Sequence, residues 1–233
     1  MKKSISKTSV RSTRGYVTAA RSRFFTVNDF AGPRSTVARA LSRLADDGEI
    51  VRVKRGLYWR GAKTPLGMAP PSSAAILREV YGKTAGVGPA LLDAARKLGL
   101  TTQVARTPSF AVPYEVEGLS LIFVNRARRT GRARHGLNDA EIALLEVLYS
   151  WEDVVELTSA DAVSRLRSLI GKTIRPKAVA AASSTESARV RERLRALLIF
   201  AGFQKVAISI LPAANATTRN EALRGIQELA AVA

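Results

Sequence analysis

The side chains with the greatest chemical potential in this sequence are its arginines and lysines. The 233 residues include 37 of these cations against 19 acids, which gives a formal net charge of +18. There is no cysteine, so thiolate metal sites and cysteine nucleophiles are excluded. His135 is the only histidine, so one chain cannot build a histidine metal cluster. The composition therefore favours attraction to a polyanion such as nucleic acid.

Motifs of known catalytic sites are missing from the sequence. There is no Walker motif, no GxGxxG and no HExxH. Neighbouring residues on a helix point in different directions, so we expect the adjacent acids at 46–47 and 152–153 to be solvated and not to form a two-carboxylate site. We expect His135 to be a polar surface residue. The sequence therefore predicts no catalytic residue, no cofactor and no bound metal.

The positive charge is concentrated near the beginning of the chain. Residues 1–63 hold 15 lysines and arginines against four acids, a net charge of +11, and residues 64–233 hold 22 against 15, a net charge of +7. A concentrated basic segment is typical of a nucleic-acid-binding module. In the remainder, five arginines lie close together without an intervening acid, at positions 126, 128, 129, 132 and 134. This arginine run is either a solvated loop or an extension of a nucleic-acid contact.

The most informative stretch is a predicted helix over residues 34–47, which follows the Gly32-Pro33 break and ends at Gly48. At about 100° per residue, its apolar residues fall between about 140° and 240° from Ser35. They are Val37, Ala40, Leu41 and Leu44. Arg39, Arg43 and Thr36 fall between about 40° and 100°, on a separate face. One face can therefore pack on a core while the other presents guanidinium groups to a partner.

Shorter elements surround this helix. A flexible basic arm through Lys7 precedes a first helix over 9–20, and Phe24-Phe25 is expected to be core or a short strand. Thr26 can cap a short helix over 27–31, with Asp29 in its first turn. Residues 49–60 alternate β-formers around a basic tip at Lys54-Arg55-Gly56, which predicts a hairpin. The order of helix, short helix, basic helix and basic hairpin is that of a winged helix-turn-helix.

Residues 24–60 resemble the N-terminal domain of the AbiEi family, the antitoxins of type IV (AbiE-type) toxin–antitoxin systems. The residues that carry the resemblance are Asp29-Phe30, the run Ser35-Thr36-Val37-Ala38-Arg39-Ala40-Leu41, Leu44, the turn Gly48-Glu49-Ile50 and Arg55-Gly56-Leu57-Tyr58. Further on, residues 98–104 read LGLTTQV and resemble the family's LGLSTQV signature. The resemblance covers about residues 15–125.

This resemblance implies more than a fold. Proteins of this kind repress their own operon through the N-terminal domain, and their C-terminal domain counteracts a nucleotidyltransferase-like toxin. Neutralisation in this type is described as occurring without a stable antitoxin–toxin complex. Operators of such systems are inverted repeats, so we expect double-stranded DNA of the protein's own promoter as a partner, with two copies on one site.

Eight residues are the predicted DNA-contacting set. Arg39 and Arg43 are expected to read base edges, because arginine can bond guanine in a bidentate manner. Ser35 and Thr36, at the helix start, can bond phosphate or bases, and the helix N-terminus favours an anion. The expected phosphate contacts are Arg34, Arg52, Lys54 and Arg55. Five residues are assigned to the core: Val37, Leu41, Leu44, Ile50 and Tyr58.

We predict an α+β protein, with a winged helix-turn-helix over 1–62, a linker over 63–71 and a helix-rich mixed domain over 72–233. Helices are predicted in the last domain over 72–81, 89–98, 139–151, 159–170, 186–201 and 218–231. Strands are predicted there over 103–105, 109–112, 119–124 and 205–211.

No apolar run approaches the roughly 20 residues that span a bilayer, so we expect a cytoplasmic protein without membrane contact. Two alternative functions remain open. One is a winged-helix regulator without a toxin, which senses something through residues 66–233. The other is an RNA-binding accessory protein or nuclease subunit.

Overall fold

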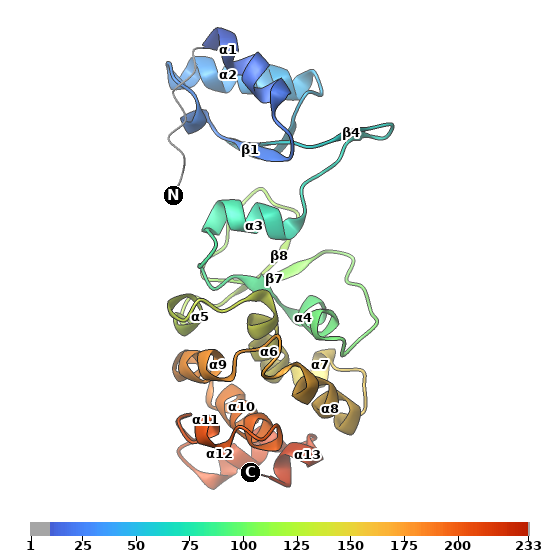
Figure 1. The fold of residues 1–233 in the computed structure, drawn as a ribbon, viewed down its shortest axis with the longest axis vertical. Helices are drawn as coiled ribbons and strands as arrows, with labels where there is room; N and C mark the ends of the chain where they lie inside the picture. Colours follow the sequence, from blue (N-terminus) through green and yellow to red (C-terminus); the bar gives the residue numbers. More distant parts are fainter. Residues whose placement is uncertain (1–9, 233) are drawn as a thin grey trace. The chain divides into compact units, whose positions relative to one another are not determined.

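The structure is a computed structural model that describes residues 10–232 (Figure 1). The basic arm predicted through Lys7 lies outside the described residues. The chain forms two compact units. Among the described residues, the first comprises 10–80 together with 116–119, and the second comprises 81–115 and 120–232.

The first unit begins with a three-stranded antiparallel sheet and two helices. Its elements are α1 (Val10–Ala19), β1 (Arg23–Phe25), the 3-10 helix η1 (Val27–Asp29), α2 (Arg34–Asp46), β2 (Val51–Lys54) and β3 (Leu57–Arg60). The strand order is β1-β3-β2. This arrangement is a winged helix, with α2 as the second helix of the helix-turn-helix and β2-β3 as the wing.

One small core holds this unit together. It consists of Val17, Phe25, Phe30, Val37, Leu41, Leu44, Ile50 and Tyr58. All five predicted core residues belong to it. The predicted short helix over 27–31 is a single 3-10 turn, and the side chain of Asp29 accepts hydrogen bonds from the backbone N–H and the hydroxyl of Thr26, at 2.7 and 3.0 Å.

The segment predicted as a linker, 63–71, contains a small hairpin of β4 (Lys63–Thr64) and β5 (Gly67–Met68), followed by α3 (Ser73–Tyr81). The Trp59 indole anchors its base by donating a hydrogen bond to the carbonyl of Ala69 at 2.9 Å. Gly61 lies directly against these two groups, and a Cβ there would overlap both. The close approach of the two chain segments therefore requires glycine at this position.

The second unit opens with a mixed sheet of three short strands. These are β6 (Gly88–Pro89), β7 (Ser109–Val112) and β8 (Ile122–Asn125), in the order β6-β7-β8, with an antiparallel first pair and a parallel second pair. The helix predicted from Pro89 begins later, as α4 (Leu91–Leu98), because Pro89 pairs with Phe110 in the sheet. The predicted strand 103–105 is irregular, and Gln103 there donates a hydrogen bond to Glu156.

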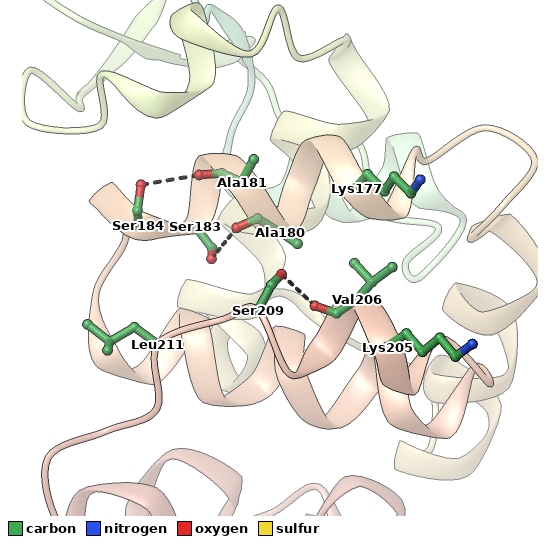
Figure 2. A pocket seen from close by; sticks show the side chains of 9 residues that line it. All are labelled: Lys177, Ala180, Ala181, Ser183, Ser184, Lys205, Val206, Ser209 and Leu211. Carbon is green, nitrogen blue, oxygen red and sulfur yellow. Dashed lines mark hydrogen bonds between the residues drawn. The ribbon is translucent and has the colours of Figure 1, made fainter.

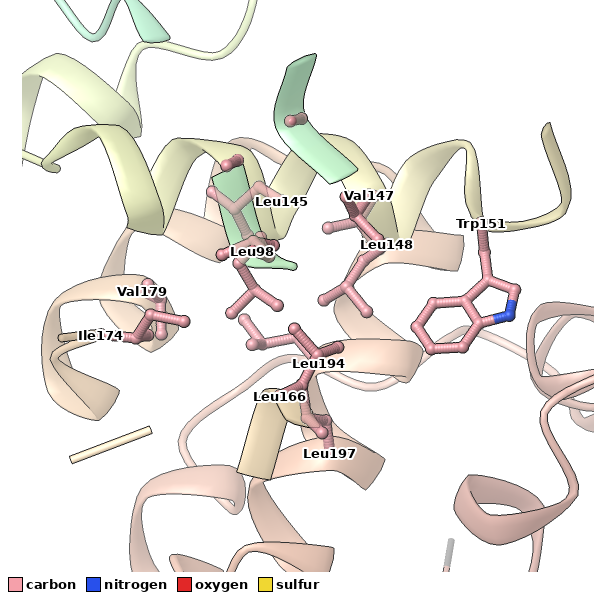
Figure 3. Close-up of a cluster of buried hydrophobic side chains, with 14 of the residues drawn as sticks. Leu98, Leu145, Val147, Leu148, Trp151, Leu166, Ile174, Val179, Leu194 and Leu197 are labelled. Carbon is pink, nitrogen blue, oxygen red and sulfur yellow. The ribbon is translucent and has the colours of Figure 1, made fainter. Parts of the chain in front are cut away.

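Helices make up the rest of this unit. They are α5 (Gly131–Arg134), α6 (Asp139–Tyr149), α7 (Trp151–Val154), α8 (Ser159–Leu169), α9 (Pro176–Ala182), η2 (Ser183–Thr185), α10 (Ala188–Phe200), α11 (Gln204–Ala207), α12 (Ala216–Leu223) and α13 (Gln227–Ala230). Asn138 caps α6 as predicted, because its side chain accepts the N–H groups of Ala140 and Glu141. The second core surrounds α6, whose Leu145, Val147 and Leu148 are fully buried (Figure 3).

Two predictions near the chain end were wrong. A strand is predicted over 205–211, but α11 and the turn that follows it occupy this region, and Ala207 and Ile210, three residues apart, are buried. The single helix predicted over 218–231 is split into α12 and α13 at Gly225, whose φ of +82° is left-handed. The sequence interpretation also missed α9. None of the helices described is long and apolar enough to cross a membrane.

Candidate nucleic-acid interface

The position of α2 explains why its two faces differ. Val37, Leu41 and Leu44 point into the core and are at most 4% exposed. Gly48, with a φ of +71°, lets the chain turn after the helix toward β2. The remaining side chains of α2 are therefore held on a rigid element with a fixed outward direction.

Four of the predicted contact residues lie on the outward side of α2. Ser35, Thr36, Arg39 and Arg43 are all exposed. Among the residues that the structure describes, neither Arg39 nor Arg43 has a hydrogen-bond or ion-pair partner for its guanidinium group. The helix start has no side-chain cap, which leaves its partial positive charge open to an anion.

Arg34 differs from the other arginines of this helix. It is exposed, but its guanidinium donates a hydrogen bond to the side-chain oxygen of Asn28 at 3.0 Å. This bond ties the start of α2 to η1. A phosphate contact by Arg34 would therefore share or replace an existing interaction.

The wing carries the other three predicted contact residues. Arg55 and Gly56 form the turn between β2 and β3, and Arg55 and Arg52 are exposed. Lys54 is only half-exposed, and it lies beside Gly118 of the same unit. Within residues 10–232 the side chains of these three cations have no hydrogen-bond or ion-pair partner. Because α2 contacts β2, the structure brings the helix and wing cations together in one unit.

Arg60 and Lys63, by contrast, form hydrogen bonds within the first unit. Arg60 donates to the carbonyl and the carboxylate of Glu49 at 2.5 and 2.9 Å, and to the carbonyl of Thr18 at 3.1 Å. Lys63 donates to the same carboxylate at 3.0 Å. The hydrogen bonds from Lys63 and then Arg60 hold the pKa of Glu49 below its usual range. Sequence reasoning missed this cluster, because its members lie 11 and 14 residues apart.

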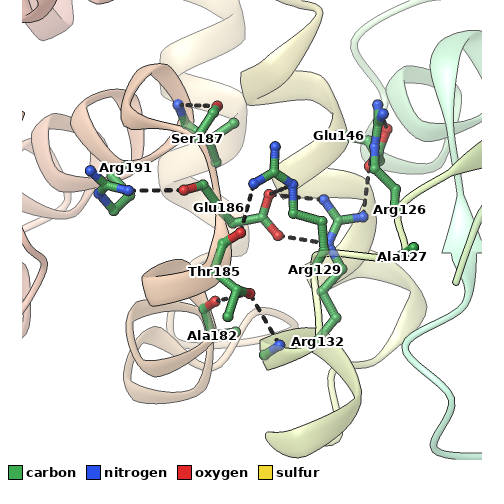
Figure 4. A network of polar contacts seen from close by, with 12 residues as sticks. Arg126, Ala127, Arg129, Arg132, Glu146, Ala182, Thr185, Glu186, Ser187 and Arg191 are labelled. Carbon is green, nitrogen blue, oxygen red and sulfur yellow. Dashed lines mark hydrogen bonds and ion pairs between the residues drawn. The ribbon is translucent and has the colours of Figure 1, made fainter.

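The arginine run belongs to the second unit and is mainly structural (Figure 4). Arg126 and Arg132 both donate to Glu146, at 2.8 and 2.6 Å, and Arg132 also donates to Glu186 at 2.7 Å. Burial acts to raise the pKa of Glu146, but the hydrogen bonds and charges of the two arginines outweigh it and lower that pKa. Arg128 and Arg134 are exposed, but Arg134 ends α5, so the description of the run as a solvated loop holds only for Arg128.

Another buried arginine corrects the expectation for an acidic pair. Arg193 is fully buried in α10 and donates to the carbonyls of Ala222 and Leu148, at 2.6 and 2.9 Å. It also donates to the carboxylate of Glu152. Glu152, expected to be solvated, is thus a half-exposed partner of a buried cation. Burial acts to raise its pKa, but the bond from Arg193 keeps that pKa low.

The described residues contain no group of three or more histidine, aspartate or glutamate side chains that could hold a metal ion. His135 is half-buried, at the end of α5. The arrangement that remains is a winged helix with a cationic outer face, on which the guanidinium groups of Arg39, Arg43 and Arg55 have no partner among the described residues.

Comparisons with known proteins agree with this class. Residues 16–59, which run from α1 into β3, match a family model described as "Transcriptional regulator, AbiEi antitoxin". The resemblance drawn from individual residues is thereby confirmed over this segment, and it supports a regulator or antitoxin role. The description of this family is that of a transcriptional regulator.

The fold as a whole is similar to a solved structure, the RV2827C protein from Mycobacterium tuberculosis. The two share 16% sequence identity with a TM-score of 0.50, over 89% of this chain and 84% of that chain. At this identity the similarity concerns the fold alone. No curated protein sequence matches the chain. The predicted fold class, α+β with an N-terminal winged helix-turn-helix before a helix-rich mixed part, is confirmed.

Proposed function

We propose that this protein is a DNA-binding antitoxin that represses its own type IV toxin–antitoxin operon. The observation that carries the DNA-binding part is the set of exposed, partner-free arginines on α2 and at the wing tip. Arg39 and Arg43 lie on one face of α2, and α2 contacts β2, the strand that leads to Arg55. This grouping on one helix and its wing supports an external anionic partner for the α2 and wing cations.

In this proposal α2 enters the major groove. Arg39 and Arg43 bond base edges, each bidentate contact with guanine contributing about 1–3 kcal/mol of discrimination. Ser35 and Thr36 bond phosphate or bases beside the helix N-terminus. The remaining proposed contacts are to phosphate, from Arg34, Arg52, Lys54 and Arg55. The wing tip reaches phosphate or the minor groove beside the helix.

The antitoxin part rests on the family match. We propose that residues 1–62 bind the operator, that 63–71 connect them to the rest, and that 72–233 counteract a nucleotidyltransferase-like toxin. Two copies of the chain bind one inverted repeat in the promoter. Neutralisation does not require a stable complex between the two proteins.

The DNA-binding proposal is tested with a fluorescent duplex of the protein's own upstream region, titrated at several salt concentrations. Arg39→Ala should lower the preference for the operator over scrambled duplex, because a base contact is lost. Arg55→Ala should weaken binding to both duplexes alike and reduce the slope of log affinity against log salt by about one unit. Arg106→Ala, which removes an exposed arginine from a loop of the second unit, is the matched control.

A competition arm separates DNA from RNA as the partner. Structured RNA added at fixed salt should displace the operator duplex only weakly. If Arg39→Ala and Arg55→Ala bind the operator duplex as the Arg106→Ala control does, α2 and the wing are not the interface. Strong preference for RNA would favour the RNA-binding alternative.

The antitoxin proposal needs a different measurement. The gene next to this one is expected to encode a nucleotidyltransferase-like protein, and expression of that protein alone should arrest growth. Co-expression of the full chain should restore growth, and so should the Arg39→Ala/Arg55→Ala variant when it is expressed from a foreign promoter. Growth arrest that the wild-type chain fails to relieve would contradict the antitoxin role while leaving DNA binding intact.

A further inference from the structure

A groove lined by lysine, serine and apolar side chains lies in the second unit, between α9 and α11 (Figure 2). We call it the α9–α11 groove. Its volume is about 430 Å³, and the lining residues that matter here are Lys177, Ser184, Lys205, Val206, Ser209 and Leu211. None of these residues takes part in the winged helix or in the arginine networks.

The walls of the groove are held in place without a ligand. Arg191 of α10 donates to the carbonyl of Leu211 at 3.0 Å and to the carbonyl of Glu186 at 2.9 Å. It thus joins the segment after α11 to the segment after α9. Beneath the groove, Ala207 is fully buried and fixes α11 to the core. A preformed site of this kind loses little conformational entropy on binding.

One end of the groove is cationic. Lys177 extends from α9 and Lys205 from α11, and both ammonium groups point toward the same end. Both side chains are exposed and, among the described residues, neither has a hydrogen-bond or ion-pair partner. No acidic residue lines the groove. The charge of this end is therefore complementary to carboxylates or phosphates.

Two serine hydroxyls add hydrogen-bond acceptors to the groove. Ser184 donates its hydroxyl hydrogen to the carbonyl of Ala181 at 3.1 Å, and Ser209 donates to the carbonyl of Val206 at 2.7 Å. Each hydroxyl has a single hydrogen, so both present only acceptor lone pairs to the groove. Acceptor lone pairs of this kind can receive the backbone N–H groups of a polypeptide bound in the groove.

Apolar side chains continue the surface. Leu211 is 67% exposed at the end of the groove opposite the lysines, and the neighbouring Ile208 is 77% exposed. Val206, half-buried, forms part of the floor. Burying these exposed apolar groups against an apolar side chain of a ligand would be favourable.

We propose that the α9–α11 groove binds an acidic and apolar segment of a partner protein. Carboxylates of the segment lie against Lys177 and Lys205, a large apolar side chain lies against Val206 and Leu211, and backbone N–H groups donate to Ser184 and Ser209. The proposal does not depend on DNA binding or on a toxin, because it uses only residues of the second unit.

The probe is a library of random short peptides displayed on phage and selected on the immobilised full chain. Peptides that bind the support without protein are removed by counter-selection. The surviving sequences should combine at least two acids with a large apolar residue. A labelled peptide of this kind should bind the charge-reversed variant at least about tenfold more weakly, because like charges replace complementary ones.

The matched control is Lys83→Glu/Lys97→Glu, which reverses two exposed lysines of the same unit outside the groove. It should bind the peptide as the wild type does. Val206→Asp should also abolish binding, while far-UV circular dichroism verifies that each variant is folded. Failure to enrich acidic peptides, or equal losses in both charge-reversed variants, would overturn the proposal. Loss of operator binding in Lys177→Glu/Lys205→Glu alone would instead assign these lysines to nucleic acid.

Discussion

Replacing Arg132 tests whether the arginine run is a structural element of the second unit. Arg132 is 1% exposed and bonds Glu186 through Nε and Nη2 at 2.7 and 3.1 Å, and Glu146 through Nη1 at 2.6 Å. In Arg132→Met the apolar stem stays and the charge is lost. Glu146 keeps its bonds from Arg126 at 2.8 and 2.9 Å, but Glu186 keeps only Arg129, at 3.4 Å.

The expected loss follows from these remaining contacts. Removing one partner of a buried ion pair costs about 3–5 kcal/mol, because an uncompensated charge stays buried. Since Arg129 and Arg126 partly compensate the two carboxylates, we expect the lower end, about 3 kcal/mol. Arg132→Met/Glu186→Gln should recover part of this loss, because no unpaired carboxylate is left at Glu186. Arg128→Met, at an exposed position of the same run, should change stability by less than about 0.5 kcal/mol.

The assay is urea unfolding of the full chain in a Trp59→Phe background. The chain has two tryptophans, so the fluorescence then reports on the buried Trp151 of the second unit. Circular dichroism should give a coincident transition for that unit. The reasoning is refuted if Arg132→Met unfolds at the same urea concentration as Arg128→Met, or if the double variant is less stable than Arg132→Met.

Three further predictions concern single groups. Burial acts to raise the pKa of Glu141, but hydrogen bonds from Arg175 and the backbone outweigh it and lower that pKa. The stability that this carboxylate contributes is therefore present above the ordinary carboxyl pKa of about 4.3 and is lost as the pH falls below it. Glu141→Gln should flatten the pH dependence of the urea unfolding midpoint in this range. Gly61→Ala should lower the free energy of unfolding by about 1–3 kcal/mol, and with it the thermal midpoint, because the added Cβ meets backbone. Gly15→Ala in α1 should be neutral or stabilising, because a Cβ there meets open space. Burial raises the pKa of Tyr81 to about 12, and its hydroxyl donates to the carbonyl of Tyr114 at 2.6 Å. In an ultraviolet pH titration, the tyrosine ionisation that occurs at the highest pH should therefore be absent from Tyr81→Phe.

The first unit could be predicted closely because its signals are local. The Gly32-Pro33 break, the helical phase of Val37, Leu41 and Leu44, and the β-formers around Gly56 all act within one element or one turn. The predicted core residues and the outward direction of Arg39 and Arg43 follow from the same phase. How those arginines contact DNA stays a prediction.

The second unit was predicted less well because long-range contacts decide its details. The partners of Arg132 lie 14 and 54 residues away along the chain, so sequence proximity alone could not distinguish a buried ion network from a charged loop. Pro89 is typical of a helix start, but pairing with Phe110 places it in a strand. Similarly, residues 205–211 are predicted as a strand, but the core takes up Ala207 and Ile210, three residues apart, and the chain forms α11 and a turn there.

The central claim is that α2 reads the operator of the protein's own promoter. The most direct test is nuclease footprinting of the full chain on that upstream DNA, with Arg39→Ala/Arg43→Ala alongside the Arg106→Ala control. We predict that the wild type and Arg106→Ala protect one inverted repeat, and that the double variant leaves it unprotected at the same protein concentration. Protection of the repeat by the double variant at wild-type concentrations, or uniform protection without a repeat, would contradict the claim.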